Sequence, residues 1–365
     1  MKKIYIIFLA LFLFLIPSIC FAQEEVSYKG KVIESKQVAC SDVLNDEYTC
    51  FEYIVEIEQL GEEKTTIPIL SEDGQPKFTN GDKVYITQMS DMESELWSIT
   101  GFNRNTPIIV LISLFCFLAI LIGKKQGLGS LISLALTVVI LYLWAIPKIL
   151  AGGDVIFIGV VSVLITLVII LYASHGFTKK SSIGVLSTAI GIVIVGILAK
   201  LFSNYIRVDG SGSEEAFLLL SQTNGSVNLS DVFFISILIG AMGVLDDVVM
   251  SQISAIVELY RANSNLNTLQ LFKRAMNIGR DHISSMVNTL FIAYAGSSLA
   301  VVMLLTYTND GIGNIIKIDV IAEEIVRTIT SSIGILLVVP ISSIIAAKLI
   351  PLSIRKGDSL KRDIN

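Results

Sequence analysis

Residues 236–258 read SILIGAMGVLDDVVMSQISAIVE, a segment that is apolar enough to enter a bilayer and yet contains Asp246, Asp247 and Glu258. A charged side chain at the centre of a membrane helix costs roughly 2.5–3.5 kcal/mol on insertion scales, so such residues are rarely accidental. At about 100° per residue, one stripe of this helix is small and polar: Ser236, Gly240, Gly243, Asp247, Ser251, Ser254 and Glu258. We therefore expect this stripe to face protein or water rather than lipid.

Asp246 lies about 100° away from the stripe, on another side of the predicted helix. The side chains of Asp246 and Asp247 can contact the same group only if the helix unwinds locally. Gly240 and Gly243 are the candidate positions for such a break, because glycine weakens a helix and broken helices build the binding sites of many transporters. The sequence therefore allows a local break of the helix at these two glycines.

The composition indicates a polytopic α-helical membrane protein. Of the 365 residues, 53% are hydrophobic, and the mean hydropathy is +0.72. The net charge of −5 argues against a nucleic-acid-binding protein. With two histidines and four cysteines in the whole chain, a metal site built from His or Cys is not expected. We assign no cofactor, although a bound cation is compatible with the carboxylates.

The first 103 residues predict a signal and an exported domain. Residues 1–22 have a basic start, an apolar run and a final alanine, typical of a cleaved secretory signal, with an uncleaved anchor as the alternative. Residues 23–103 predict about five short strands, because residues 51–60 and 83–89 alternate apolar and polar side chains, and they suggest a small extracytoplasmic β-barrel or sandwich. Cys40 and Cys50 can pair across a short loop if this domain is exported, and a reduced pair is the alternative.

Residues 104–352 predict a transmembrane domain with about seven spans, and residues 353–365 predict a basic cytoplasmic tail. The spans are 106–122, 127–146, 154–174, 183–203, 231–257, 283–306 and 327–350. Ser187 and Gly191 lie one turn apart and favour close helix packing. A short helix is expected in the outer loop, around residues 214–221.

The basic residues of the loops predict the orientation. With the β-domain outside, the loops that face outward contain Lys148, Arg207 and Lys317. The inner loops and tail contain Lys124, Lys125, Lys179, Lys180, Arg261, Lys273, Arg274, Arg280, Arg355, Lys356, Lys361 and Arg362. This asymmetry follows the positive-inside rule and places the C-terminus in the cytoplasm. His175 ends a span beside two lysines, and we expect an interfacial histidine there rather than a proton relay.

A second polar helix follows an inner loop of about 20 residues. Asp281, Ser285 and Asn288 lie on one side of it, and Tyr294 lies on another. At 1.5 Å per residue, Asp247 and Asn288 both fall in the inner half of the membrane, where the carboxyl, hydroxyl and amide oxygens can meet. Such a site suits a hard cation or a proton. The alternative is that Asn288 only joins helices through a hydrogen bond.

The last span begins with Glu323, Glu324 and Arg327 at the outer end. Glu323 and Arg327 have the i,i+4 spacing of a helical ion pair. Glu323, Glu324 and Arg327 are candidates for an outer gate. A salt bridge at a helix end, without a gating role, is the alternative.

These two polar segments resemble the YibE/F family of bacterial membrane proteins. The resemblance rests on Gly240-Ala241-x-Gly243, Asp247, Ser251, Glu258, Gly279-x-Asp281, Asn288-Thr289-Leu290 and Tyr294. It extends over roughly residues 28–350. Proteins of this family are regarded as permeases or transporters, so the resemblance implies transport without naming a substrate.

Two functions are compatible with these features. The first is a transporter of a small ion or solute, with Asp247 as its central carboxylate, Glu258 and Asp281 at the inner mouth, and Ser251 and Asn288 as neutral ligands. The second is a receptor or assembly factor whose exported domain binds a partner. We expect no enzyme: the chain lacks the GxxxxGK[ST] pattern of ATP-hydrolysing proteins and the GxGD motif of intramembrane aspartyl proteases. The expected partners are the lipid bilayer, the transported solute, and a homo-oligomer or another membrane protein.

Overall fold

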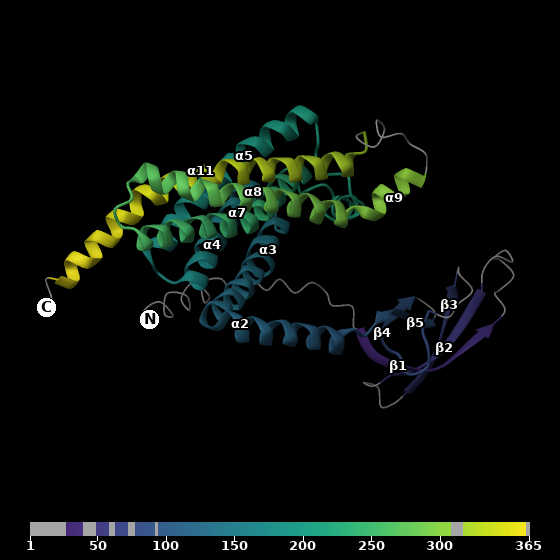
Figure 1. Ribbon diagram of the computed structural model, residues 1–365. Helices are drawn as coiled ribbons and strands as arrows, with labels where there is room; N and C mark the ends of the chain where they lie inside the picture. The colour runs from purple at the N-terminus through teal and green to yellow at the C-terminus, as the bar shows by residue number, and fades with distance from the viewer. Residues whose placement is uncertain are drawn as a thin grey trace. The chain divides into compact units, whose positions relative to one another are not determined.

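The computed structural model describes residues 27–38, 49–57, 63–71, 77–91, 94–307 and 317–362. The chain divides into two compact units, one over Cys20–Leu118 and the other mainly over Ala119–Asn365. Figure 1 shows that the first contains the β-strands and the second contains most of the helices. The predicted signal and Cys40 lie outside the described residues.

The first unit contains one antiparallel sheet of five strands. Its strands are β1 (Ser27–Val38), β2 (Thr49–Ile57), β3 (Glu63–Ser71), β4 (Lys83–Asp91) and β5 (Ser94–Phe102), in the order β3-β2-β1-β4-β5. The edge strands β3 and β5 also contact each other, so the sheet curls on itself. In β2, Phe51, Tyr53, Val55 and Ile57 are all buried, because alternate side chains of a strand point to the same face. The predicted strands are thus confirmed, and among the described residues they form a curled sheet rather than a two-sheet sandwich.

The core of this sheet supports a prediction about Tyr53. Its fully buried ring packs edge-on against Phe78, with ring centroids 5.4 Å apart, and its hydroxyl accepts a hydrogen bond of 2.9 Å from the Lys77 N–H. Tyr53→Phe keeps the packing and removes the hydrogen bond, so we expect it to destabilise the sheet by about 1 kcal/mol. Limited proteolysis of the full-length protein in increasing urea measures this. Tyr28→Phe, at a half-buried tyrosine that packs on Trp97, is the control; equal losses in both variants would contradict the role of the hydroxyl.

The helical part of the chain contains one long kinked segment and a bundle. The elements are α2 (Asn105–Val139), the π-helix η2 (Ile140–Ala145), α3 (Ile146–Leu150), α4 (Val155–His175), α5 (Lys179–Ile206), α6 (Glu214–Gln222), α7 (Leu229–Ala262), α8 (Thr268–Ser297), α9 (Leu299–Tyr307) and α11 (Asp319–Arg362). The short helix α6 confirms the prediction for the outer loop. It begins at Ser213, whose hydroxyl accepts a hydrogen bond from the Ala216 N–H.

Within the described residues, five helical segments are long and apolar enough to cross a membrane: Asn105–Leu150, Val155–His175, Lys179–Ile206, Leu229–Ala262 and Asp319–Leu352. The chain is therefore a membrane protein. The first segment has 46 residues, too many for one ordinary span, and Lys124 interrupts it with φ 50° and ψ −126°. This break falls between the first two predicted spans. The predicted span 283–306 is divided between α8 and α9 and is not one of the five, so the number seven stays a prediction.

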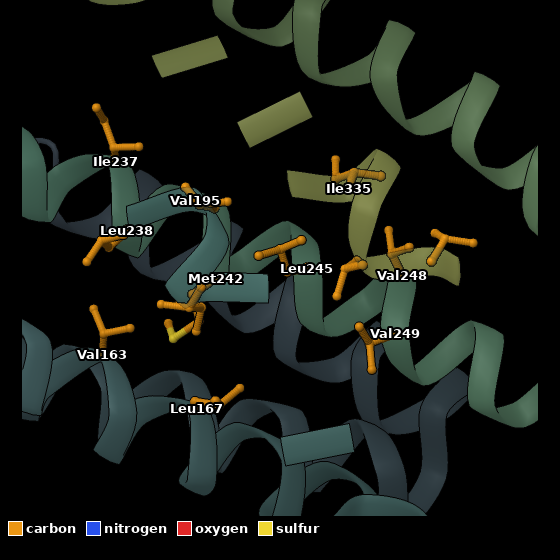
Figure 2. Packing of buried hydrophobic residues seen from close by; sticks show 14 of the residues in the cluster. Val163, Leu167, Val195, Ile237, Leu238, Met242, Leu245, Val248, Val249 and Ile335 are labelled. Carbon is orange, nitrogen blue, oxygen red and sulfur yellow. The ribbon is translucent and has the colours of Figure 1, made fainter. Parts of the chain in front are cut away.

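Helix α7 lies at the centre of the bundle and packs against α4, α5, α8 and α11. Figure 2 shows its buried side chains Met242, Leu245, Val248 and Val249 among apolar residues of neighbouring helices. The apolar residues of α7 are buried on all sides except the polar stripe, because four helices surround it.

Close packing of α5 and α11 completes the core. A Cβ atom at Gly191 would lie 2.9 Å from Val338 Cγ2, and one at Gly334 would overlap Val195 Cγ2. Gly191 therefore lies beside Val338, and Val195, four residues later in α5, lies beside Gly334, four residues earlier in α11. The two helices are antiparallel. The predicted role of Gly191 in close packing is confirmed.

Candidate functional site

The polar stripe of α7 is the exposed side of that helix in the single chain. Gly243, Asp247, Ser251 and Glu258 are exposed, and Ser236, Gly240 and Ser254 are half-buried. The remaining sides of α7 face the four neighbouring helices. Among the described residues, Tyr294 of α8 packs on Gly240, and the stripe is exposed at Gly243, Asp247, Ser251 and Glu258.

Helix α7 is continuous from Leu229 to Ala262, so the predicted break at Gly240 and Gly243 does not occur. Asp246 and Asp247 consequently point to different sides. Asp246 is only 6% exposed and accepts a hydrogen bond of 2.9 Å from the Asp247 N–H, whereas Asp247 is exposed. An unbroken helix is favoured because packing on four sides stabilises it more than glycine propensity, about 1 kcal/mol per residue, destabilises it. We therefore separate Asp246 from the site around Asp247.

Helix α8 begins earlier than predicted. Asn267 accepts a hydrogen bond of 2.9 Å from the Gln270 N–H, and the Gln270 side chain accepts one of 3.1 Å from the Asn267 N–H. This capping box starts the helix at Thr268, so the predicted loop of about 20 residues is a short turn followed by a basic helical segment.

The polar side of α8 is exposed next to α7. Gly279 and Ala275 pack inward, and Asp281, Ser285, Asn288 and Thr289 are exposed. We name the exposed residues of both helices the α7–α8 polar face: Gly243, Asp247, Ser251, Glu258, Asp281, Ser285, Asn288 and Thr289. Figure 1 shows the two helices side by side.

Both histidines of the chain interact with Asp247. The Asp247 carboxylate has electrostatic interactions with His175, at the end of α4, and with His282 of α8. Ser285 and Thr289 lie within about 60° of His282 on the helix, so they share its side. Imidazole and carboxylate groups exchange protons readily, because the unperturbed pKa of histidine is near neutral. Both histidines are thus within electrostatic range of Asp247, but no hydrogen bond or ion pair joins either of them to its carboxylate among the described residues.

Gln252 is a second residue that the sequence reasoning missed. It is 3% exposed, and its Nε2 donates hydrogen bonds of 2.8 Å to the Ala275 carbonyl of α8 and to Ser343 Oγ of α11. Gln252 thus connects three helices. The signal was present in the sequence, because Gln252 is a polar residue about 140° from Asp247 on an apolar helix.

The end of the bundle where α11 begins contains an ion pair, but not the predicted one. Arg327 Nη1 lies 3.5 Å from Glu324 Oε2, so the i,i+3 pair forms in place of the pair with Glu323. Glu323 is buried and accepts a hydrogen bond of 2.9 Å from the Gly212 N–H. It therefore attaches the outer loop to the start of α11.

A cavity of about 180 Å³ lies beside this ion pair. Tyr294 and Glu324 line it together with mainly apolar residues of α8, α9 and α11. The Tyr294 hydroxyl lies 3.1 Å from where a Cβ of Gly240 would be, so the glycine allows the ring to approach α7. Tyr294 therefore belongs to this outer cavity, and its place is separate from Asp247.

The outer loop is also ordered by local hydrogen bonds. The Ser211 hydroxyl and backbone N–H donate to Asp209 Oδ1 over 2.6 and 3.0 Å, and they hold the pKa of Asp209 below its usual range. Ser230, in the first turn of α7, donates to the Asp209 carbonyl. The loop is thus attached to both α7 and α11.

In the part of the chain that the structure describes, no three His, Cys, Asp or Glu side chains form a group that could hold a metal ion. The described residues around Asp247 offer this carboxylate, two histidines within electrostatic range and the neutral oxygens of Ser251. This arrangement suits proton exchange or a loosely held cation.

Comparison with known proteins agrees with the helical core. A family model described as YibE/F-like protein matches residues 111–352, which include the α7–α8 polar face, Gln252 and the outer ion pair. The match does not reach the β-sheet, so that part of the resemblance stays a prediction. No curated protein and no solved structure matches the chain. Because the matched region is more than half of the sequence and holds the five-helix core, this chain belongs to the YibE/F-like family.

Proposed function

We propose that this protein is a membrane transporter that moves a small ion or solute along the α7–α8 polar face. The observation that carries this proposal is an exposed carboxylate, Asp247, on a helix that is long and apolar enough to cross a membrane. Ionisable residues in such helices are costly, and they commonly form ion pathways or proton relays.

Each residue has a role that follows from its chemistry. Asp247 is the carboxylate that binds the cation or proton. Ser251 and Asn288 offer neutral oxygens. Glu258 and Asp281 attract cations at the inner mouth, and Glu324 with Arg327 gates the outer end. The protein binds and moves its solute without chemical reaction.

The proposed orientation places the β-sheet outside a bacterial cell and the C-terminus in the cytoplasm. One structural observation supports it: Lys180, Glu258 and Arg261 interact with one another at one end of the bundle. Basic residues gathered at one end are typical of the cytoplasmic side.

Transport by reconstituted protein tests the role of Asp247. We expect Asp247→Asn to reduce ion or proton flux into vesicles at least about tenfold, because the amide keeps the shape and loses the charge and the exchangeable proton. Asp231→Asn is the matched control, since it makes the same change in the first turn of the same helix. Full transport by Asp247→Asn would overturn the carboxylate role.

The second candidate function is a receptor or assembly factor. It is favoured by one observation, that the β-strands form a compact unit with a core of their own. In that case Asp247→Asn would leave all fluxes unchanged, and deletion of the sheet would abolish capture of a partner.

A further inference from the structure

Asp246 is a buried carboxyl group that the proposed pathway does not use. It is 6% exposed, and it accepts a hydrogen bond of 2.9 Å from the backbone N–H of the neighbouring Asp247. Among the described residues, the ion pairs are those of Arg261 and Arg327, so no basic side chain pairs with Asp246. A buried carboxylate without a positive partner is costly, and a carboxyl group avoids this cost by holding a proton.

A buried hydroxyl group without a hydrogen-bond partner lies opposite this aspartate. A Cβ at Gly184 of α5 would lie 2.6 Å from Met250 Sδ of α7, and one at Gly191 would lie 3.3 Å from Leu245 Cδ1, so the two helices are antiparallel. Thr188 is one turn after Gly184, and the aspartate is one turn before Met250, so the two residues are opposite each other across the helix pair.

The hydroxyl of Thr188 suits a group that changes its protonation state. Thr188 is fully buried, and its hydroxyl has no hydrogen-bond partner among the described residues. A hydroxyl can accept a hydrogen bond from a protonated carboxyl and donate one to a carboxylate. It can therefore serve Asp246 both with and without its proton.

Asp247 is the charged residue that interacts electrostatically with Asp246. Among the described residues, His175 and His282 act on Asp247 and neither acts on Asp246. Adjacent carboxylates repel each other, so a cation at the exposed Asp247 makes ionisation of Asp246 easier. Two charges about 7 Å apart at an effective dielectric constant of about 20 change each other's affinity by roughly 50-fold, and by less where water reaches one of them. The coupling is reciprocal, so loss of the proton strengthens cation binding by the same factor.

We propose that Asp246 is a proton site coupled to a cation site at Asp247, so that the protein exchanges a cation for a proton. This inference rests on the proposed transport function and adds the coupling ion. When a cation binds at Asp247, the O–H bond of the Asp246 carboxyl breaks, its electron pair stays on the oxygen, and the proton passes to water. Because each ion weakens binding of the other, the cation and the proton cross the membrane in opposite directions.

Proton release by purified protein tests the coupled site. Wild type in weakly buffered detergent solution receives Na⁺, K⁺, Mg²⁺ or Ca²⁺ in separate runs, with binding measured by calorimetry and proton release by a pH indicator. We expect at least one cation to release up to about one proton per chain and to bind about tenfold more weakly at acidic pH. Asp246→Asn should bind this cation with little proton release and with the weaker affinity, because the amide has the neutral charge of the protonated acid.

Asp231→Asn, in the first turn of the same helix, is the control and should behave like wild type. Cation binding without proton release would overturn the proton site, and so would equal release from wild type and Asp246→Asn. Both results would leave the transport function intact.

Infrared difference spectra of wild type decide the matter even where Asp246→Asn fails to fold. Cation binding should remove the C=O band of a protonated carboxyl. Thr188→Val should shift this band, because Thr188 is opposite Asp246 on the buried side of α7, whereas Asp247 is exposed. A band that persists after cation binding, or that is unchanged in Thr188→Val, would overturn the assignment to Asp246.

Vesicles that contain a pH indicator separate failure of this inference from failure of the proposed function. Uptake of the cation by wild type should make the vesicle interior more alkaline, because protons leave in exchange. Uptake without a change of internal pH would overturn the exchange alone. If none of the four cations enters, the proposed cation transport is wrong, and this inference fails with it.

Discussion

Gly334→Val is expected to lower the free energy of unfolding of the helical bundle by about 3 kcal/mol, near the upper end of what overpacking costs. A Cβ atom at this position would overlap Val195 Cγ2, and Val195 is fully buried. Valine at 195 is stiff at χ1 and cannot turn away without a new clash. Helices α5 and α11 must therefore separate, and this pair forms the most extensive helix–helix contact of the described residues.

Thermal melting of purified protein in detergent measures this loss. The control is Gly296→Ala in α8, where an added Cβ would meet nothing within 4 Å. Because alanine favours helix over glycine by about 1 kcal/mol, the control should melt at the same or a higher temperature. A Gly334→Val protein that melts like wild type would show that α5 and α11 do not pack as described.

Gln252→Ala is expected to destabilise the bundle by about 2–3 kcal/mol, combining lost hydrogen bonds with a small cavity. The side chain is 3% exposed and donates to both Ala275 and Ser343, so the substitution disconnects α7 from α8 and α11 at one point. Gly279 packs directly on this amide, with a hypothetical Cβ 3.1 Å from Gln252 Nε2. No water can easily replace the amide in so tight a place.

The adjacent residue supplies the matched control. Ser251 is exposed on the polar face, so Ser251→Ala should change the stability of the single chain by no more than about 0.5 kcal/mol. Melting curves of both variants in detergent decide the matter. Equal losses would contradict the assignment of Gln252 as the connection between three helices.

Local sequence patterns determined much of this protein. Hydropathy over long runs identified membrane helices, because a bilayer accepts only segments that satisfy their own backbone. Period-two alternation identified β2 and β4, and helical periodicity separated Asp247 from Asp246. These signals lie within one element, so no knowledge of its neighbours was needed.

Other features were not predicted, for two reasons. That α7 stays helical at Gly240 and Gly243 depends on its packing against four other helices. The start of α8 at Thr268 and the pairing of Arg327 with Glu324 rest on local contacts between residues three apart, for which the sequence offered more than one choice. The sequence predicted a polar stripe that faces protein or water, and the described part of the chain leaves four of its residues exposed.

The residues of the candidate site also divide into those that the sequence identified and those that only the tertiary structure identified. The sequence alone identified the carboxylates, because a charge on an apolar helix is conspicuous in one dimension. Only the tertiary structure enclosed Gln252 between three helices. Residues as far apart as Gln252 and Ser343 become neighbours through helix packing, and no local periodicity encodes which helix lies beside which.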